Sequence, residues 1–139
     1  MVIVYGTNNS LVSWLIRAAT FGKYSHCAIL DEEHWVIHST FLRGVHRSTL
    51  KSFQEAYPTH YFSHIVCPDE AGAMHFLEAQ LGKPYDWSAL LKLVFQRDWQ
   101  ENDRWFCSEL AEAALVAGNS QRFRDSVHRI TPHQSWSVL

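Results

Sequence analysis

The chain has 139 residues, which is enough for one domain and too few for two of ordinary size. Hydrophobic residues make up 47% of it, aromatic residues 14% and charged residues 19%, a mixture that can build a core and excludes a disordered chain. The formal net charge is -2 and there is no basic patch, so no nucleic-acid partner is expected.

The apolar stretches are too short for stable membrane insertion. The longest, residues 111–117, is interrupted by Glu112 and cannot span a bilayer. The first residues lack the basic segment and the small-residue cleavage site of a secretory signal, so a cytoplasmic location is the default expectation. A phage-encoded protein, or one with a specialised export route, would carry no such mark. The sequence leaves the oligomeric state and the biological partner open.

Short strands dominate the first half of the chain, because apolar and β-branched residues occur there in short runs. Ser10 is placed to cap a helix whose apolar residues recur at helical spacing, namely Leu11, Trp14, Leu15 and Ala18. In chain order, the expected elements are a buried strand at 2–5 that ends at Gly6, a helix at 10–20, a hairpin of strands at 25–30 and 35–39, a strand from Gly44, a short helical segment at 48–56 and a strand at 61–66.

The second half predicts three helices. The first covers residues 69–81 and ends at Gly82. Asp86 can cap the second, which would carry Leu90, Leu91, Val94 and Phe95. The third begins at Asn102 or Asp103 and runs through Cys107 to Ala117, with Gly118 as a left-handed C-cap. Early strands and late helices predict one α+β domain over residues 1–139, with helices against one face of a small antiparallel sheet.

Cys107 is the sharpest candidate for chemistry. The chain has three widely spaced cysteines and no CxxC pair, so free thiols are expected. Near the start of a helix, backbone N–H groups and the helix dipole favour the thiolate of Cys107. The alternative is a structural role, in which Cys107 is a core cysteine that packs with Leu110, Ala111 and Ala114. Cys27 and Cys67 are interpreted as structural.

His26 lies inside an apolar strand and therefore needs a polar partner. Strand alternation places it on the face opposite Cys27. His38, at the end of the next strand, can approach His26 across the hairpin and orient its ring. A satisfied core histidine is the alternative interpretation of His26.

A metal site is not expected. His34 and His38 have the i, i+4 spacing of a helical zinc site, but the residues between them favour a strand. In a strand their side chains would stand more than about 12 Å apart, at roughly 3.3 Å per residue.

Several short motifs follow one another in a recognisable order, namely Tyr24-Ser25-His26-Cys27-Ala28-Ile29, Val36-Ile37-His38, Gly44-Val45, Gly82-Lys83-Pro84-Tyr85-Asp86, Phe106-Cys107-Ser108-Glu109-Leu110 and Thr131-Pro132. Together they resemble the circularly permuted branch of the NlpC-type papain-like superfamily, the YiiX-like cysteine hydrolases. That branch also includes the lecithin:retinol acyltransferase-like proteins. The resemblance spans nearly the whole chain, and it depends on the order and spacing of the motifs.

The resemblance implies a circularly permuted papain-like fold and a role for each matching residue. His26 matches the general base, Cys107 matches the nucleophile, and His38 stands where a polar residue orients the base. Many YiiX-like members have a glutamate at this third position. The histidine here is closer to the acyltransferase-like pattern, so the substrate class is left open.

The resulting hypothesis is a cysteine hydrolase that acts through an acyl-enzyme, without cofactor or metal. The backbone N–H of Cys107 is the expected oxyanion donor, and Tyr85 or Tyr24 could assist it. Asp86 is either a helix cap or a neighbour of the site. The favoured substrate is an amide in a cell-wall peptide.

Two alternatives are a lipid acyl hydrolase or acyltransferase, and a catalytically idle binding or assembly module. A deep apolar groove beside Cys107 would favour lipid, and a polar cleft with an Arg or Lys would favour peptide. A Cys107 thiol that is buried or far from His26 would favour the idle module.

Overall fold

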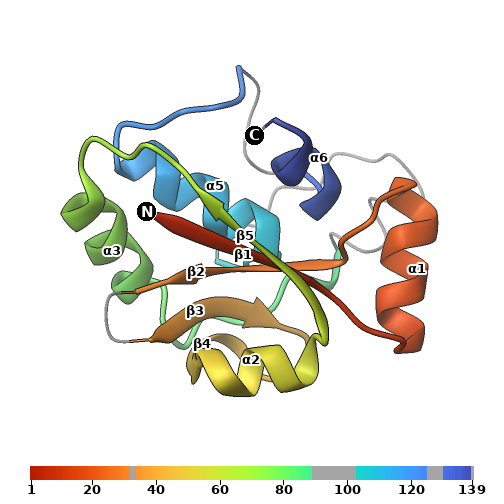
Figure 1. Cartoon of the computed structure of the whole chain (residues 1–139). Helices are drawn as coiled ribbons and strands as arrows, with labels where there is room; N and C mark the ends of the chain where they lie inside the picture. Colours follow the sequence, from red (N-terminus) through yellow and green to blue (C-terminus); the bar gives the residue numbers. More distant parts are fainter. Residues whose placement is uncertain (32–33, 89–102, 125–129, 139) are drawn as a thin grey trace.

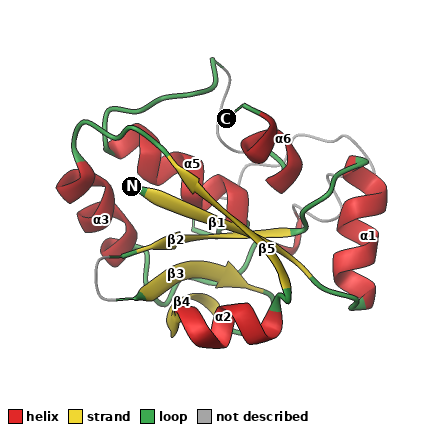
Figure 2. Ribbon diagram, viewed as in Figure 1, coloured by secondary structure: helices red, strands yellow, loops and turns green. Residues whose placement is uncertain are grey.

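The computed structural model describes residues 1–31, 34–88, 103–124 and 130–138. In these residues five strands form one antiparallel sheet in the order β4-β3-β2-β1-β5, with helices around it (Figures 1 and 2). The strands are β1 (Val2–Thr7), β2 (His26–Leu30), β3 (Trp35–Thr40), β4 (Gly44–Thr49) and β5 (Thr59–His64). The helices are α1 (Leu11–Thr20), α2 (Leu50–Ala56), α3 (Glu70–Ala79), α5 (Cys107–Ala117) and α6 (Pro132–Ser137). The predicted α+β class is confirmed.

Helices cover both faces of the sheet, whereas the sequence predicted one. Alternation along each strand sends side chains to opposite faces. On one face the strands pack with α5 and with Leu77 of α3, through Ile3, Tyr5, Cys27, Ile29 and Ile37. On the other face Phe53 of α2 packs against Val4, Ala28 and Val36. The short α2 therefore closes the second face.

The predicted cap at Ser10 is confirmed, and two other predicted caps are wrong. Ser10 accepts a hydrogen bond from the Ser13 N–H at 3.2 Å, and Asp69 accepts one from the Gly72 N–H at 2.8 Å. The cap of α5 is Phe106, so this helix begins at Cys107 and not at Asn102 or Asp103. Most of the helix predicted after Asp86, including Leu90, Leu91, Val94 and Phe95, lies outside the described residues.

Gly118 does not serve as a left-handed C-cap. Its φ is -86°, and the left-handed residue is Asn119, with φ 59°. Gly118 is instead a site of close approach, because an added Cβ would lie 2.3 Å from the Cys67 sulfur. Gly6 also differs from the prediction, since β1 continues through it to Thr7. A Cβ at Gly6 would lie 2.7 Å from Cβ of Tyr57.

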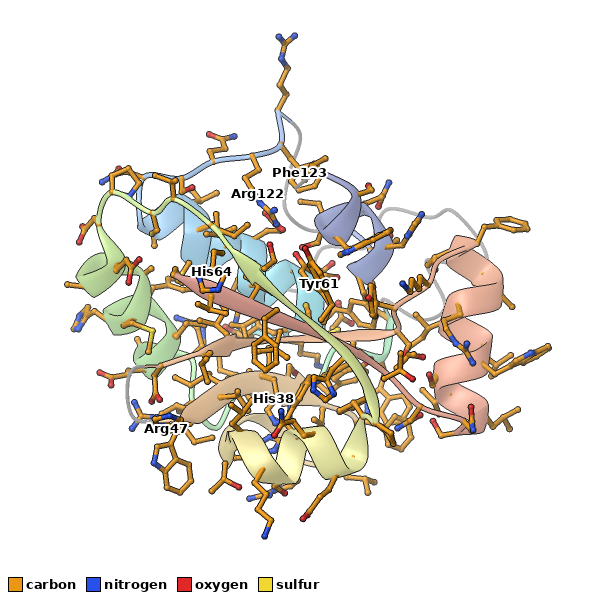
Figure 3. The ribbon with its side chains drawn as sticks, viewed as in Figure 1. His38, Arg47, Tyr61, His64, Arg122 and Phe123 are labelled. Atoms are coloured by element: carbon orange, nitrogen blue, oxygen red, sulfur yellow. The ribbon has the colours of Figure 1, made fainter. Side chains whose placement is uncertain are left out.

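A buried polar cluster attaches the C-terminal helix to the core. Arg122 forms an ion pair with Glu112 of α5 and donates to Ser135 Oγ of α6 at 3.1 Å (Figure 3). Ser135 donates in turn to Glu112 at 2.6 Å, and its hydroxyl lies 2.9 Å from that of Tyr5 in β1. Glu112 is almost fully buried, so its charge depends on these partners. Among the described residues, no helix is both long and apolar enough to cross a membrane.

The turn at Gly44 attaches the segment that carries Tyr85 to the sheet. Val45 N–H donates to Lys83 O at 2.8 Å, and Gly82 N–H donates to Val45 O at 2.9 Å. Gly44 has φ 62°, and a Cβ there would lie 2.2 Å from Lys83 O. Two separate sequence motifs, Gly44-Val45 and the one from Gly82, thus meet at one backbone junction.

We expect Gly44→Ala to lower the free energy of unfolding by roughly 1–3 kcal/mol or more, since it combines a left-handed φ with a backbone collision. Gly82→Ala is the matched control. Its φ is 85°, but nothing lies within 4 Å of the added methyl group. Urea unfolding of both variants measures the difference, and equal losses would contradict the importance of the Gly44–Lys83 contact.

Candidate active site

Two buried histidines meet at one end of the sheet. His26 is the first residue of β2, and His38 lies on β3, which pairs with β2 through Ile29–Ile37 and Leu30–Val36. Nε2 of His26 lies 2.9 Å from Nδ1 of His38, within hydrogen-bonding distance. The approach of His38 to His26, which the sequence predicted across the hairpin, is present.

His38 is held as a neutral ring. Burial, followed by the charges of His26, His46 and Arg43, lowers the pKa of His38 well below its ordinary value. Its Nε2 lies 3.0 Å from the Ser48 hydroxyl, so both ring nitrogens have partners. In neutral His38, Nδ1 can accept a hydrogen bond from Nε2–H of His26 only if the ring proton is on Nε2, from which it donates to the Ser48 hydroxyl. The tautomer of His38 therefore follows from its two neighbours.

Tyr57, which sequence reasoning missed, forms one wall of the site. Its ring stacks on His26 with centroids 4.7 Å apart and planes 10° apart. Phe53 approaches both His26 and His38, at 5.9 and 5.7 Å. Gly6 leaves the space that Tyr57 occupies. No local pattern marks Tyr57 in the sequence, because it reaches His26 only through the docking of α2.

Cys107 is the first residue of α5. Its neighbours hold the helix start in place, because the Glu109 carboxylate accepts a hydrogen bond from the Phe106 N–H at 3.3 Å and Ser108 donates to Ile130 O. The predicted position of the thiol in the first turn of a helix is therefore present. Backbone N–H groups of a first turn have no partner within their helix and favour a negative charge.

Burial would raise the pKa of the Cys107 thiol, but other contacts outweigh it. The thiol of Cys27, the imidazole of His26 and the backbone N–H of Cys27 all favour the thiolate and hold the pKa of Cys107 well below its ordinary value. The same contact with Cys107, followed by burial, raises the pKa of Cys27. Of the two thiols, Cys27 keeps its proton and donates a hydrogen bond to the sulfur of Cys107.

Cys27, interpreted from the sequence as structural, is buried in the core and also contacts Cys107. Alternation does turn it away from His26, but the face it points to is the one on which α5 packs. Cys27 is fully buried there, against the start of α5. Both faces of β2 thus contribute to the surroundings of Cys107, which lies at the strand's end.

Tyr85 and Asp86 approach the site through the segment before Cys107. Tyr85 pairs with Trp105 in an isolated bridge, and the Asp86 N–H donates to Trp105 O at 3.2 Å. Ser39 of β3 donates to the same carbonyl at 2.7 Å. Burial, and then the charge of Cys107, raise the pKa of Tyr85, so its phenol stays protonated. Asp86 accepts a hydrogen bond from the Ser88 hydroxyl at 2.6 Å.

Tyr24 lies apart from these residues. It is buried beside Tyr5 and Trp136, with ring centroids 6.0 and 5.4 Å away. Within the described part of the chain, it is not among the residues that line the cleft next to His26. Of the two tyrosines proposed to assist the oxyanion, the structure brings only Tyr85 to that cleft.

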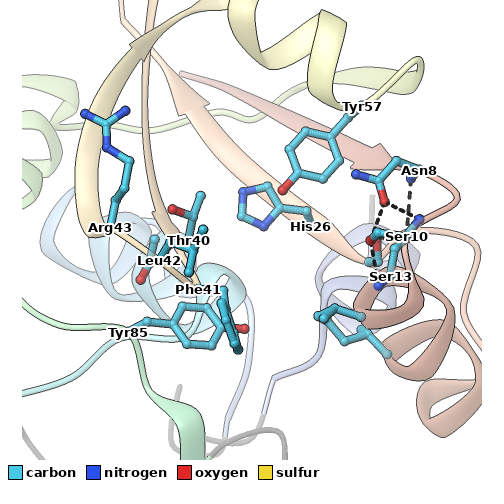
Figure 4. Close-up of a pocket in the computed structure, with 14 residues that line it drawn as sticks. Asn8, Ser10, Ser13, His26, Thr40, Phe41, Leu42, Arg43, Tyr57 and Tyr85 are labelled. Atoms are coloured by element: carbon cyan, nitrogen blue, oxygen red, sulfur yellow. Dashed lines mark hydrogen bonds between the residues drawn. The ribbon is translucent and has the colours of Figure 1, made fainter.

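A cleft of about 360 Å³ opens beside His26 (Figure 4). The start of α1 forms one side with Ser10, Val12 and Ser13, and the turn after β3 forms the other with Phe41, Leu42 and Arg43. Tyr57 and Tyr85 complete the walls around His26 (Figure 4). Cys107 is not one of the lining residues in the described chain, and its side chain is only 2% exposed.

No family model and no curated protein matches the chain. Among solved structures, it is similar to one described as the metalloprotein YiiX from Escherichia coli O157:H7, with 21% sequence identity and a TM-score of 0.68. The match covers 87% of this chain and 66% of that one, so this chain spans about two thirds of the length of that structure. The chain therefore has a YiiX-like α+β fold, in agreement with the sequence motifs.

We expect absorbance at 240 nm, taken as the difference between wild type and Cys107→Ser, to report a thiolate that titrates well below the pKa of about 8.5 of a free cysteine. Cys27→Ala removes one thiol donor and should move that titration to higher pH. Cys67→Ala is the matched control, because Cys67 bonds to Gly118 O and not to Cys107. A difference signal that rises only above the free-thiol pKa would contradict the lowered pKa of Cys107.

Proposed function

We propose that the chain is a cysteine hydrolase in which Cys107 is the nucleophile, His26 is the general base and His38 orients His26. The observation that carries the proposal is the continuous contact from Ser48 through His38 and His26 to a Cys107 whose pKa is lowered. Nucleophile, base and orienting group in such contact are what covalent acyl transfer requires.

The proposed reaction has two steps. The Cys107 thiolate attacks the carbonyl carbon and forms a C–S bond, and the protonated His26 donates its proton to the leaving group as the scissile bond breaks. His26 then takes a proton from water, the hydroxide attacks the thioester, and the C–S bond breaks to release the acid and restore the thiolate. Because Nε2 of His26 faces His38, its Nδ1 is the nitrogen assigned to these transfers.

Negative charge on the carbonyl oxygen would be stabilised at the start of α5. The Cys107 N–H is among the first N–H groups of that helix, which lack intrahelical acceptors. The protonated Tyr85 phenol is the second candidate donor, since it lines the cleft and its pKa responds to the charge of Cys107.

For the substrate we keep the amide of a cell-wall-type peptide as the first candidate. Arg43 supports it, because a guanidinium on the cleft wall could bind a substrate carboxylate. The apolar side chains Val12, Phe41 and Leu42 in the same walls favour a lipid acyl group as the second candidate. The near-complete burial of Cys107 favours the third, a catalytically idle binding or assembly module.

No step of the proposed mechanism uses a metal. YiiX is described as a metalloprotein, but the described residues of this chain hold no group of three His, Cys, Asp or Glu side chains able to bind a metal ion. His26 and His38 contact each other directly through ring nitrogens, which a shared metal would have to separate. The side chains present here therefore do not fit a metal centre.

The test combines alkylation with intact-mass detection of an acyl-enzyme. Iodoacetamide should label Cys107 faster than Cys67 at neutral pH in wild type, and His26→Ala should remove that preference. Incubation with p-nitrophenyl esters of short and long acyl chains and with peptide p-nitroanilides should give an acyl adduct on Cys107 for one class. If Cys107 labels no faster than Cys67 and no substrate acylates it, the hydrolase proposal fails.

We expect His26→Ala to reduce turnover by on the order of 10²–10⁴-fold, since it removes the proton acceptor and donor. His38→Ala should cost less, because it leaves His26 present but without its acceptor, and His38→Asn should restore part of the loss through an amide oxygen. The turnover rate of each variant, measured against pH, separates the general base from the orienting residue. A His38→Ala variant with unchanged rate and pH profile would contradict an orienting role.

A further inference from the structure

Helix α1 turns its apolar side toward solvent. The spacing that predicted an amphipathic helix is present, but the buried positions are Ser13 and Ile16. Ser13 is bound inside the protein, with its hydroxyl 2.6 Å from that of Ser25. The exposed large side chains form what we call the outer stripe of α1, which consists of Leu11, Val12, Trp14 and Leu15.

The outer stripe is continuous with the mouth of the cleft. Val12 belongs to both the stripe and the cleft wall. Across the mouth, the turn after β3 presents Phe41 and Leu42, and Leu42 is 88% exposed. Trp14 is 57% exposed. Apolar side chains on two separate elements thus border one opening, which is more than the scattered exposure usual for a protein surface.

On the described segments that carry these side chains, residues 8–23 and 41–43, every charged residue is positive. Residues 1–30 contain no Asp or Glu, although the whole chain has 14 acidic residues against 12 basic ones. Arg17 lies on α1, Lys23 follows it, and Arg43 follows Leu42 on the opposite rim. Helix α6, which approaches Gly22 through His133, carries no acidic residue either.

We propose that the outer stripe of α1 and the turn at residues 41–43 dock this protein onto an anionic lipid surface, with the mouth of the cleft facing the lipid. Tryptophan and leucine on one face with Lys or Arg beside them is the composition of helices that lie in a membrane interface. Arg17, Lys23 and Arg43 lie on segments that contain no carboxylate, residues 8–23 and 41–43, and they match a negatively charged leaflet.

A second copy of the chain fits this face less well than lipid does. A two-fold dimer through the outer stripe would pair two copies of α1, each of which carries Arg17 and no carboxylate to offset the like charge. Contact with lipid through side chains of a ten-residue helix is peripheral and reversible, so it requires no membrane-spanning segment. The docking does not depend on Cys107 or on turnover.

The experiment is co-sedimentation of the whole chain with vesicles. Wild type should pellet with equimolar phosphatidylglycerol–phosphatidylcholine vesicles. Binding to phosphatidylcholine vesicles should be weaker by roughly 100-fold, because three cations lose their attraction. Added salt should weaken binding to the anionic vesicles, since exposed charges are screened.

Trp14→Glu and Leu42→Glu should each lower the partition coefficient by about tenfold or more, since each places a carboxylate in the apolar rim. Val66→Glu is the matched control. Val66 is 86% exposed, lies between β5 and α3, and undergoes the same change in charge. Circular dichroism establishes that the variants are folded, and Cys107→Ser should bind vesicles like wild type.

Three results would overturn the proposal. The first is that the wild-type protein stays in the supernatant with both kinds of vesicle, which would show that it does not bind lipid. Light scattering that finds a wild-type dimer without vesicles, and a Trp14→Glu monomer, would assign the stripe to a second copy. A large loss of stability in Trp14→Glu, with wild-type vesicle binding in Leu42→Glu, would mean that the stripe packs against the protein itself.

Discussion

The hydrogen bond between His26 and His38 is the contact on which the candidate site depends. It joins two strands at the end of the sheet, in surroundings where burial disfavours charge on His38. A neutral His38 bound to Ser48 leaves one nitrogen free to accept from His26. His26 also contacts Cys107, where it favours the thiolate.

Contacts elsewhere in the fold support the strand that carries His38 and the segment that leads to Cys107. The junction of Gly44 and Val45 with residues 82–83 fixes the segment leading to Tyr85, and Tyr85 pairs with Trp105 just before Cys107. Ser39, the neighbour of His38, binds the Trp105 carbonyl, so β3 supports both the orienting histidine and the approach to the nucleophile. Hydrogen bonds to backbone carbonyls therefore join the Gly44-Val45 motif, the segment from Gly82 and the segment that leads to Cys107.

The cleft and the outer stripe of α1 bear on the same question, which is what the protein acts on. The cleft walls combine apolar side chains with Arg43, and the stripe extends the apolar character to the surface around the mouth. Cys107 is almost fully buried and is not among the described residues that line the cleft, so a substrate carbonyl would reach the thiol only if part of a cleft wall moved.

The sequence by itself determined the α+β class, most elements, the helix cap at Ser10 and the identity of Cys107, His26 and His38 as the residues to examine. These depend on local spacing and on motif order, which a sequence records. Only the tertiary structure decided that Cys27 contacts Cys107, that Tyr57 stacks on His26, and that Tyr24 stands apart, since each depends on which helix packs on which face of the sheet. The direction of the α1 stripe was also undecidable from periodicity. Helical spacing identifies an apolar face, but whether that face turns inward depends on the partners that Ser13 finds inside the protein.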